Sequence, residues 1–338
     1  MELTEHKLIF TSKELETDQE VRWCPGCGDY AILKSVQKVL PDFGRPKHEF
    51  VFISGIGCSS RFPYYMDTYG MHSIHGRATA IATGLKSARP ELSVWVVTGD
   101  GDALSIGGNH LIHTLRRNPD LNILLFNNQI YGLTKGQFSP TSEQGKITKS
   151  SPIGTVDLPF NPLALALGSN GTFVARTMDR DPKHQQEIYR RAYEHKGTSL
   201  VEIYQNCNVF NDGAFEVFTE KSSKPLNTLF LEHGKPMVFD NGSKGIILDE
   251  MTPKVVDIID NQVDHLWHHD EQDAIKAYIL SRFFDNEELP RPFGVLYCHN
   301  NRETFDDGIN AQIKSKQIAD KKAAFNQLLK SNNSWMVG

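Results

Sequence analysis

The amino-acid sequence predicts an α/β fold in which a doubly wound, parallel sheet is covered by helices on both faces. Two observations indicate this fold. Between residues 28 and 210, short apolar segments alternate with segments whose apolar residues recur at helical spacing. The strand-like segments are apolar throughout rather than at every second position, which is typical of parallel strands buried on both faces.

The expected elements follow one another regularly along the chain. We predict strands over 48–54, 93–98, 122–126, 173–177 and 199–204, and helices over 29–40, 77–88, the segment ending at 117, 159–168 and 181–195. Beyond about residue 215 the pattern weakens, and further helices are expected near 270–284 and 309–329. The sequence therefore predicts a first domain over 1–215. A C-terminal extension over 216–338 is expected to pack on that domain or at subunit interfaces.

Charge and hydropathy exclude several classes of function. The formal net charge is −5, the isoelectric point is near 6.2, and no block of Lys or Arg is present, which argues against a nucleic-acid-binding surface. The apolar runs are shorter than a membrane span requires. The N-terminus lacks the basic and apolar regions of a signal peptide. We expect a cytoplasmic protein that binds neither nucleic acid nor membrane.

Residues suited to ligand binding follow several of the expected strands. These segments are Gly55–Cys58, Gly99–Gly101, Asn127–Asn128 and Asn206–Cys207. Because open parallel sheets bind ligands at the carboxyl ends of their strands, these segments are expected to share one site. The long polar connection over 131–158 is also expected to be functional.

The Gly-Asp-Gly and Asn-Asn segments favour a site for magnesium and a diphosphate. Gly99 and Gly101 lack side chains, so backbone amides can approach phosphate oxygens at the start of a helix. The Asp100 carboxylate, the Asn128 side-chain oxygen and the Ile130 carbonyl would give Mg²⁺ three oxygen ligands. Each segment alone is also an ordinary turn or loop, but their placement at consecutive strand ends favours the metal site.

The five cysteines suggest metal ligation rather than disulfides, because an odd count in a chain without a secretion signal disfavours a disulfide framework. The Cys24-x-x-Cys27 pair suits zinc, an iron–sulfur cluster or a redox dithiol. A zinc site would need a second pair nearby, and a redox dithiol would leave Cys58 and Cys207 unused. Four thiolates at one sheet edge favour a [4Fe–4S] cluster, and Cys298 is expected to be a packed free thiol.

Four further motifs extend the pattern, namely Trp-Cys-Pro-Gly-Cys-Gly at 23–28, Gly-Ile-Gly-Cys-Ser-Ser-Arg at 55–61, His-Gly-Arg-Ala at 75–78 and Tyr-Gly-Leu-Thr-Lys-Gly-Gln at 131–137. Together with the two segments above, in order and spacing, they resemble the beta subunits of 2-oxoacid:ferredoxin oxidoreductases. The resemblance covers residues 20–215 densely. Leu-Glu-His-Gly-Lys-Pro at 231–236 is similar to the 2-oxoglutarate branch, whereas 295–299 departs from the family pattern.

The resemblance implies a fold of the thiamine-diphosphate-binding, pyrophosphate-domain type with thiamine diphosphate, Mg²⁺ and a [4Fe–4S] cluster as cofactors. It implies oxidative decarboxylation of a 2-oxo acid, here 2-oxoglutarate, to an acyl-CoA, with electrons passing through the cluster to ferredoxin. Because the glutamate that activates the coenzyme is not found in a suitable motif here, an alpha subunit is expected to complete the site. An (αβ)₂ assembly is implied in the same way.

The resemblance also implies roles for individual residues. Arg61 is expected to grip a substrate carboxylate through two parallel hydrogen bonds, and His75 is expected to take part in catalysis and, with Arg77, to bind the diphosphate. A surface arginine and a structural histidine are the alternatives. The other expected coenzyme contacts are Gly57, Cys58, Gly99, Asp100, Gly101, Asp102, Asn128, Ile130, Gly132 and Leu133.

Three other functions remain open on sequence grounds. The substrate could be pyruvate or another 2-oxo acid. A thiamine-dependent decarboxylase subunit without electron transfer would leave four ordered cysteines without a purpose. A zinc-stabilised α/β binding module would leave the Gly-Asp-Gly and Asn-Asn pair unexplained. The metal that the cysteines hold separates these alternatives.

Overall fold

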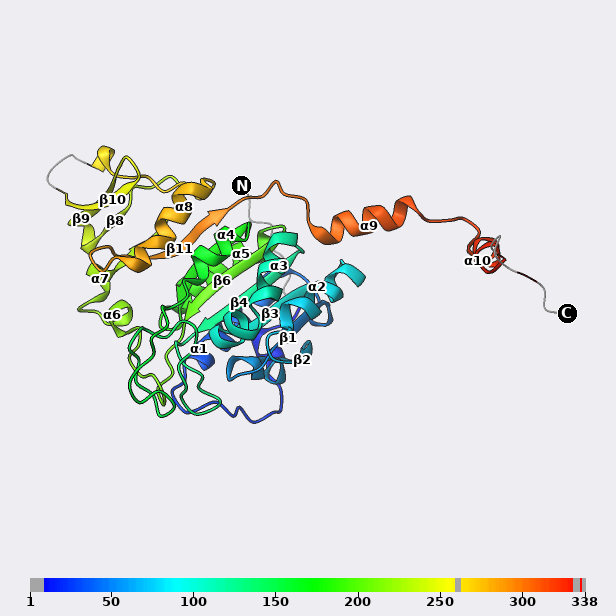
Figure 1. The fold of residues 1–338 in the computed structure, drawn as a ribbon, viewed down its shortest axis with the longest axis horizontal. Coiled ribbons are helices and arrows are strands. Elements are labelled where there is room, and N and C mark those ends of the chain that lie inside the picture. The colour runs from blue at the N-terminus through cyan, green and yellow to red at the C-terminus, as the bar shows by residue number, and fades with distance from the viewer. Residues whose placement is uncertain (1–8, 259–262, 331–334, 336–338) are drawn as a thin grey trace.

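The main sheet of the protein has eight strands in the order β2-β1-β3-β4-β6-β5-β11-β7. The computed structural model describes residues 9–258, 263–330 and 335 (Figure 1). The strands are β1 (Phe50–Ser54), β2 (Tyr69–His72), β3 (Ser93–Gly99), β4 (Leu121–Asn127), β5 (Phe173–Met178), β6 (Thr198–Tyr204), β7 (Thr228–Phe230) and β11 (Arg291–Cys298). Strands β1 to β6 are mutually parallel, as predicted, whereas β11 runs antiparallel to β5 and parallel to β7.

Helices cover both faces of this sheet, which confirms the doubly wound α/β fold. Successive side chains of β1 enter different cores: Val51 lies on one face and Phe50 on the other, because neighbouring side chains of a strand point to opposite faces. The first core is closed by α2 (Ala78–Ala88), α3 (Gly108–Arg117), α4 (Pro162–Gly168) and α8 (Ala274–Ser281), and the second by α1 (Asp29–Val39) and α5 (Pro182–Glu194). None of the helices in the described ranges is long and apolar enough to span a membrane.

Local sequence signals explain where these helices begin and end. Helix α5 begins at Pro182, whose fixed φ suits a first helical position, and the Asp181 carboxylate accepts a hydrogen bond from the His184 N–H. Helix α3 ends before Asn118, which adopts a left-handed conformation with φ +60°. The predicted segments of the first domain all appear, with boundaries shifted by a few residues.

The C-terminal extension completes the main sheet, which the sequence analysis did not foresee. After α6 (Glu216–Thr219) and α7 (Lys224–Asn227) it supplies the edge strand β7, and later β11 pairs with β5 and β7. Between them, β8 (Val238–Phe239), β9 (Lys244–Asp249) and β10 (Thr252–Asp257) form a small antiparallel sheet. The domain boundary at residue 215 stays a prediction, but two strands beyond it belong to the main sheet.

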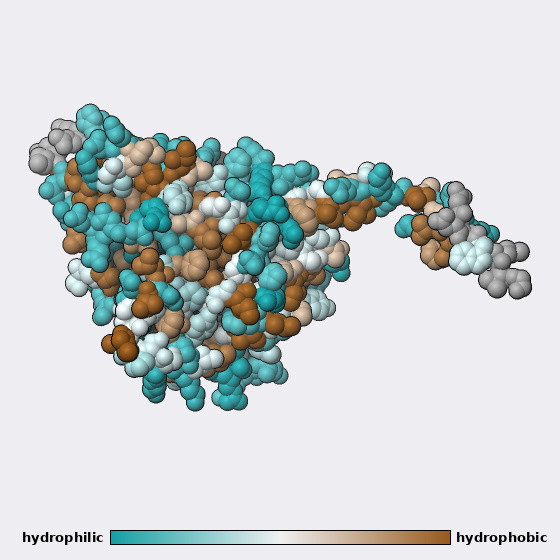
Figure 2. Space-filling model, viewed as in Figure 1, coloured by the Kyte–Doolittle hydropathy of each residue, from teal (hydrophilic) through white to brown (hydrophobic). Residues whose placement is uncertain are grey.

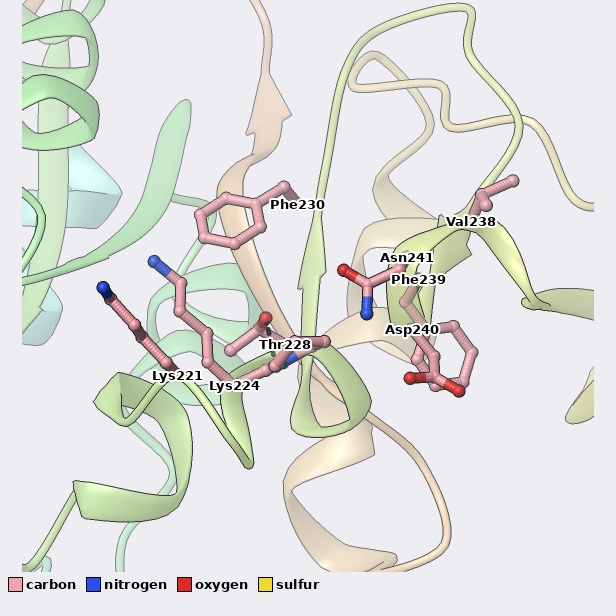
Figure 3. Close-up of a pocket in the computed structure, with 9 residues that line it drawn as sticks. Lys221, Lys224, Thr228, Phe230, Val238, Phe239, Asp240 and Asn241 are labelled. Carbon is pink, nitrogen blue, oxygen red and sulfur yellow. Dashed lines mark hydrogen bonds between the residues drawn. The ribbon is translucent and has the colours of Figure 1, made fainter.

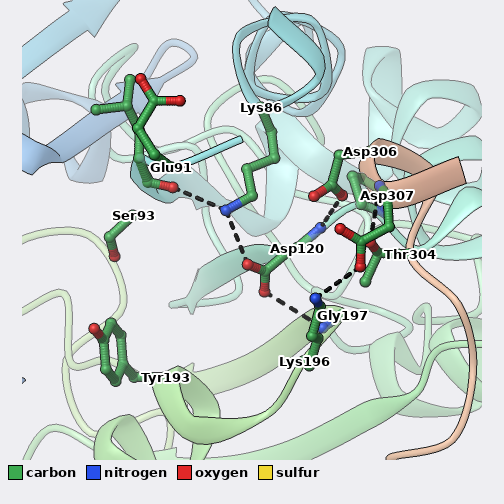
Figure 4. Close-up of polar contacts among 12 residues, drawn as sticks. Lys86, Glu91, Ser93, Asp120, Tyr193, Lys196, Gly197, Thr304, Asp306 and Asp307 are labelled. Atoms are coloured by element: carbon green, nitrogen blue, oxygen red, sulfur yellow. Dashed lines mark hydrogen bonds and ion pairs between the residues drawn. The ribbon is translucent and has the colours of Figure 1, made fainter. Parts of the chain in front are cut away.

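The end of the chain forms an arm, residues 305–329, that leads away from the body (Figure 1). It consists of α9 (Phe305–Ser315) and α10 (Lys321–Leu329), separated by 316–320, rather than the single helix predicted over 309–329. Its root is fixed, because Lys196 pairs with Asp307 at 2.7 Å and the Asp306 carboxylate accepts a hydrogen bond from the Asp120 N–H at 2.9 Å (Figure 4). Helix α10 has no buried residue, and apolar side chains are visible on the arm in Figure 2.

Candidate functional site

The carboxyl ends of β1, β3, β4 and β6 lie side by side because these four strands are neighbours in the sheet. Their register pairs Gly99 with Phe126 and Asn127 with Tyr204. Two cavities lie at this edge. One, of about 140 Å³, is lined by the Gly-Asp-Gly segment, and the other, of about 240 Å³, by four cysteines. We call them the Gly-Asp-Gly cavity and the cysteine cavity.

The two cavities share a wall, and the predicted coenzyme contacts gather in the first. Residues that line both cavities are Cys58, Asn128, Gly132 and Leu133. The Gly-Asp-Gly cavity is also lined by Gly57, His75, Gly99, Asp100, Gly101, Asp102 and Ile130. The predicted contacts are therefore brought together by the fold, with the exception of Arg77.

Arg77 does not reach this cavity in the described structure. Gly76, with φ +71°, turns the chain just before Arg77, and the Arg77 Nη1 donates a hydrogen bond to the Ile106 carbonyl oxygen at 3.0 Å. A Cβ on Gly76 would lie 2.6 Å from the Gly107 nitrogen, so the turn needs glycine. Arg77 thus ties the start of α2 to the segment after Gly-Asp-Gly rather than lining the cavity.

Asp100 is almost fully buried, and its position depends on the long loop over 131–158. The hydroxyls of Ser139 and Thr141 both lie 2.5 Å from Asp100 Oδ2 and donate to it. Burial raises the pKa of the Asp100 carboxyl to about 6, although these hydrogen bonds act in the opposite direction. A nearby cation would favour the ionised form. The sequence predicted a functional loop but did not single out Ser139 and Thr141.

A tight turn at the end of β4 places two more oxygen atoms at the same cavity. Gln129 adopts φ +56°, and the Asn128 Oδ1 accepts a hydrogen bond from the Ile130 N–H at 3.2 Å. The Asn211 side chain donates to the Asn128 carbonyl at 2.9 Å and fixes the turn from outside. A carboxylate, an amide oxygen and a backbone carbonyl at one cavity form a hard-oxygen set of the type that Mg²⁺ prefers.

Asp102 connects the segments around the Gly-Asp-Gly cavity. Its Oδ1 accepts hydrogen bonds from His75 Nδ1 at 2.5 Å and from the Gly76 N–H at 2.7 Å, and its Oδ2 accepts one from the Thr98 hydroxyl at 2.6 Å. With Nδ1 donating to Asp102, Nε2 is the His75 nitrogen left for the cavity. A Cβ on Gly55 would lie 1.9 Å from Asp102 Oδ2, so glycine at 55 makes room for this carboxylate.

The cysteine cavity is built from four separate segments, 22–27, 58–61, 128–135 and 205–210, and hydrogen bonds connect some of them. It is lined by Cys24, Cys27, Cys58 and Cys207, as the sequence predicted, and also by Arg22, Arg61 and Lys135. The Trp23 indole donates to the Cys58 carbonyl at 2.7 Å. The Asn208 amide donates to the Pro25 carbonyl at 2.6 Å. Cys298, in contrast, is a buried free thiol in the second core.

Burial and the neighbouring Asp29 raise the pKa values of two of the cysteine thiols, Cys27 and Cys58. Burial raises the pKa of the Cys58 thiol to about 12, with smaller contributions from Asp29 and Cys207, whereas Arg61 lowers it. The pKa of the Cys27 thiol is raised further by the same burial and by Asp29. Arg61 lies on this side of the shared wall, where its Nε donates to the Tyr65 hydroxyl at 2.9 Å. A positive metal centre in this cavity would favour the ionised, thiolate form of Cys27 and Cys58.

The wall between the two cavities is thin because residue 132 is glycine. A Cβ at this position would lie 3.5 Å from Cys207 Sγ and 3.6 Å from Cys58 Sγ. Within the described residues, no three His, Cys, Asp or Glu side chains are arranged to share a single metal ion. The four sulfur atoms therefore surround a space rather than a point.

Another cavity, of about 370 Å³, lies in the C-terminal extension (Figure 3). Its wall includes Lys221, Lys224, Phe230 and Asn241. Lys224 is already engaged there, because its ammonium pairs with Asp181 at 3.1 Å and lies 5.0 Å from the centre of the Phe230 ring. No residue predicted from the sequence motifs lines this cavity, so the two cavities at the sheet edge are the better candidates.

Comparison with known proteins indicates the family of the chain. Residues 55–203 match the family model of the thiamine pyrophosphate enzymes' C-terminal thiamine-binding domain. The 2-oxoglutarate oxidoreductase subunit KorB of Mycobacterium tuberculosis is 51% identical over 330 residues, which are 96% of this chain and 88% of that protein. The 2-oxoglutarate synthase subunit KorB of Archaeoglobus fulgidus is 45% identical over 55% of this chain and 69% of its own length.

A solved structure shows the same fold. The 2-oxoglutarate:ferredoxin oxidoreductase from Magnetococcus marinus, solved with 2-oxoglutarate, coenzyme A and succinyl-CoA bound, matches with a TM-score of 0.76 at 33% identity. The match covers 96% of this chain and 97% of the other chain. The chain thus carries a thiamine-diphosphate-binding domain, and it belongs to the beta subunits of the 2-oxoacid:ferredoxin oxidoreductases, the multi-subunit oxidoreductases that the sequence motifs indicated.

Proposed function

We propose that this beta subunit binds the diphosphate of thiamine diphosphate with Mg²⁺ in the Gly-Asp-Gly cavity and a [4Fe–4S] cluster in the cysteine cavity. With its alpha subunit, it would convert a 2-oxo acid, 2-oxoglutarate foremost, into the acyl-CoA and carbon dioxide, and pass the electrons to ferredoxin. The observation that supports this most strongly is the wall that the two cavities share at Cys58 and Gly132.

Asp100, Asn128 and Ile130 are the residues that would hold Mg²⁺. The buried Asp100 carboxylate supplies the charge, and both hydroxyl donors act on its Oδ2, so Oδ1 is the oxygen without a side-chain donor among the described residues. Asn128 and Ile130 supply neutral oxygens from the neighbouring strand end. Gly99 would let the diphosphate approach the backbone at the start of the following helix, whereas glycine at 101 makes room for the Tyr131 ring, because a Cβ there would lie 2.2 Å from a ring carbon.

Cys24, Cys27, Cys58 and Cys207 would each bind one iron of the cluster. Zinc is a poorer fit. With a zinc–sulfur distance of about 2.3 Å, tetrahedral ligands of one ion come within roughly 4 Å of one another, and no such group of three occurs in the described ranges. A four-iron cluster distributes its thiolates over separate iron atoms.

The shared wall explains how the two cofactors could act together. When bound, thiamine diphosphate supplies the carbanion chemistry that releases carbon dioxide and two electrons from a 2-oxo acid, and the cluster accepts electrons singly. The chain's own task is to hold both close together with only Cys58, Asn128, Gly132 and Leu133 between the two cavities. Transfer over such a short path needs no mobile carrier.

His75 and Arg61 have separate roles in this proposal. Asp102 orients His75 so that its Nε2 can hold or donate a proton within the Gly-Asp-Gly cavity. Arg61 and Lys135 present two positive charges on the cysteine side of the wall, where they would bind the second carboxylate of a dicarboxylic 2-oxo acid. The substrate named for the Magnetococcus marinus enzyme, 2-oxoglutarate, is such an acid.

The partners follow from the family. An alpha subunit would complete the coenzyme site, because this chain offers no motif for the activating glutamate, and two αβ pairs would form an (αβ)₂ assembly. Ferredoxin would accept the electrons and coenzyme A the acyl group. We place this assembly in the cytoplasm, with no nucleic-acid or membrane partner.

The proposal is tested by assaying the αβ complex, purified under nitrogen, for reduction of a dye acceptor. Addition of 2-oxoglutarate and coenzyme A should reduce the dye faster than addition of pyruvate and coenzyme A. Cys207→Ser should abolish dye reduction, whereas Cys298→Ser, which alters a thiol outside both cavities, should leave it intact. Dye reduction that survives Cys207→Ser would show that the cluster is not needed to pass electrons, and carbon dioxide release by the wild-type complex without dye reduction would leave a decarboxylase without electron transfer.

A further inference from the structure

Gln205 is a buried side chain that touches one of the four cysteines and has no role in the function described so far. It follows directly after β6 and is 1% exposed. Its backbone N–H donates to the Asn127 carbonyl at 2.9 Å, which continues the ladder between β6 and β4. Its side-chain Nε2 lies 3.2 Å from Cys27 Sγ and 2.7 Å from the Asn206 carbonyl oxygen.

The orientation of this amide is fixed by the groups around it. The Asn206 carbonyl can only accept hydrogen bonds, and it already accepts one from the Gly28 N–H at 3.2 Å. The nitrogen of the Gln205 amide, and not its oxygen, must therefore face Asn206, and the second amide hydrogen then points toward Cys27. The Gln205 Oε1 has no hydrogen-bond partner within the described structure. Leaving a buried oxygen without a hydrogen bond costs free energy. The amide therefore keeps its N–H contact with the Cys27 sulfur at the expense of a hydrogen bond to its own oxygen.

We propose that Gln205 is a positioning residue that sets the reduction potential of the cluster through an N–H···S hydrogen bond to Cys27. The inference rests on the proposed function, because it requires a cluster on Cys27. Reduction adds a negative charge that is shared by the cysteine sulfurs. A hydrogen-bond donor at a sulfur stabilises that charge, so it raises the potential. The nearby Asp29 carboxyl opposes negative charge on Cys27, and Gln205 offsets part of that effect.

The test compares the wild-type αβ holoenzyme with Gln205→Leu, which keeps much of the volume but has no donor. Iron and sulfide contents are measured first, and then the midpoint potential by an EPR-monitored redox titration. We expect the same cluster content and a potential more negative by about 59 mV, which corresponds to a tenfold shift of the one-electron equilibrium. The matched control is Gln37→Leu, a buried glutamine whose amide contacts the Tyr65 carbonyl at 3.4 Å. It should leave the potential unchanged.

A second measurement does not depend on how the variant folds. Pulsed EPR on the reduced wild-type holoenzyme, with ¹⁵N in the glutamine side chains, should detect coupling between the cluster and a side-chain nitrogen. An unchanged potential in Gln205→Leu, or absence of that coupling in the wild type, would overturn the role of Gln205 while leaving the cluster in place. Absence of iron from the wild-type chain would instead overturn the proposed function itself.

Discussion

Two aspartates at the Gly-Asp-Gly segment, Asp100 and Asp102, are two residues apart and have different surroundings, and this contrast decides what each can do. One carboxylate oxygen of Asp100 accepts hydrogen bonds from two hydroxyls. Burial raises the pKa of this carboxyl to about 6. Asp102 is held by His75, Gly76 and Thr98. The first is arranged to receive a cation, and the second to hold neighbouring segments in position.

We predict that Asp100→Asn stabilises the protein in the absence of Mg²⁺ and coenzyme while it abolishes Mg²⁺-dependent coenzyme binding. An amide removes the penalty of burying an ionised carboxylate, which from the pKa shift is on the order of 3 kcal/mol at neutral pH. Chemical denaturation at pH 7 and calorimetric titration with thiamine diphosphate measure the two effects. A less stable variant that still binds the coenzyme would contradict the assignment.

The matched substitution Asp102→Asn should act in the opposite direction. An amide group in place of this carboxylate loses charge-assisted hydrogen bonds, and its N–H atoms would face donors such as the Gly76 N–H. The free energy of unfolding should fall by about 2 kcal/mol. Chemical denaturation of both variants measures these opposite changes in the free energy of unfolding. A rise is expected where a cation ligand is replaced, at Asp100, and a fall where a structural carboxylate is replaced, at Asp102.

The raised pKa of Asp100 also predicts a pH dependence of stability. In the folded state this carboxyl holds its proton up to about pH 6, whereas in the unfolded chain it loses it near its ordinary value of 3.8. Between these values the folded state binds more protons, so the contribution of Asp100 makes the unfolding free energy fall as pH rises from about 4 to about 6 and then level off. Asp100→Asn should remove this contribution. Equal slopes in wild type and variant would show that Asp100 is not the group responsible.

At the level of elements, a buried polar network joins the C-terminal extension to the site. Arg176 on β5 pairs with Glu202 on β6 at 2.7 Å, and its Nη1 donates to the Pro292 carbonyl of β11 at 3.1 Å. Glu202 also accepts from the Asn127 amide at 2.7 Å, and Asn127 lies 2.9 Å from the Thr141 hydroxyl that reaches Asp100. The strand register that brings Arg176 opposite Glu202 thus connects this buried ion pair, through Asn127 and Thr141, to Asp100.

Breaking this network on one side should be strongly destabilising. We predict that Arg176→Met lowers the free energy of unfolding by about 3–5 kcal/mol, because Glu202 would remain as an unpaired buried charge. The double variant Arg176→Met/Glu202→Leu should recover most of that loss. A single variant as stable as the wild type, measured by chemical denaturation, would show that the pair adds nothing to the fold.

The sequence predicts elements well where the signal is local and poorly where it is not. Parallel strands such as β3 and β4 stand out as short apolar runs, and glycine or asparagine at their ends identifies the site. The insertion of β11 beside β5 depends on contacts between residues more than a hundred positions apart, which no local pattern records. For the same reason the sequence analysis did not single out Ser139 and Thr141, which contact Asp100 across the fold. Arg77 lies outside the cavity lining in this structure, and its contact with the diphosphate stays a prediction.

On the scale of the whole molecule, the body and the arm differ in how they are stabilised. The body encloses two cores, whereas α10 has no buried residue and exposes Phe325, Leu328 and Leu329. Isolated helices of this length are marginal in water. The arm therefore takes its direction from its root, where Thr304 and Asp306 are buried against the body.

We predict that a chain ending at Ser315 unfolds at the same temperature as the full chain, because none of the described residues beyond Ser315 is buried. A chain ending at Asn301 should unfold at a lower temperature, since it also loses the Asp306 contact with Asp120 and the Asp307 pair with Lys196. Comparing the unfolding temperatures of the three chains shows whether the body is stabilised by residues 302–315 or by the residues beyond Ser315. A marked drop on removal of the tip alone would show that α10 packs on the body.

The central claim is that one chain holds a four-iron cluster beside the thiamine site. The most direct measurement is the content of iron, acid-labile sulfide and zinc per polypeptide in the αβ complex purified under nitrogen, with Cys207→Ser as the comparison. We predict about four irons and four sulfides for this chain's site, lost in the variant, and no stoichiometric zinc. One zinc per chain without sulfide, or iron that Cys207→Ser fully retains, would contradict the account.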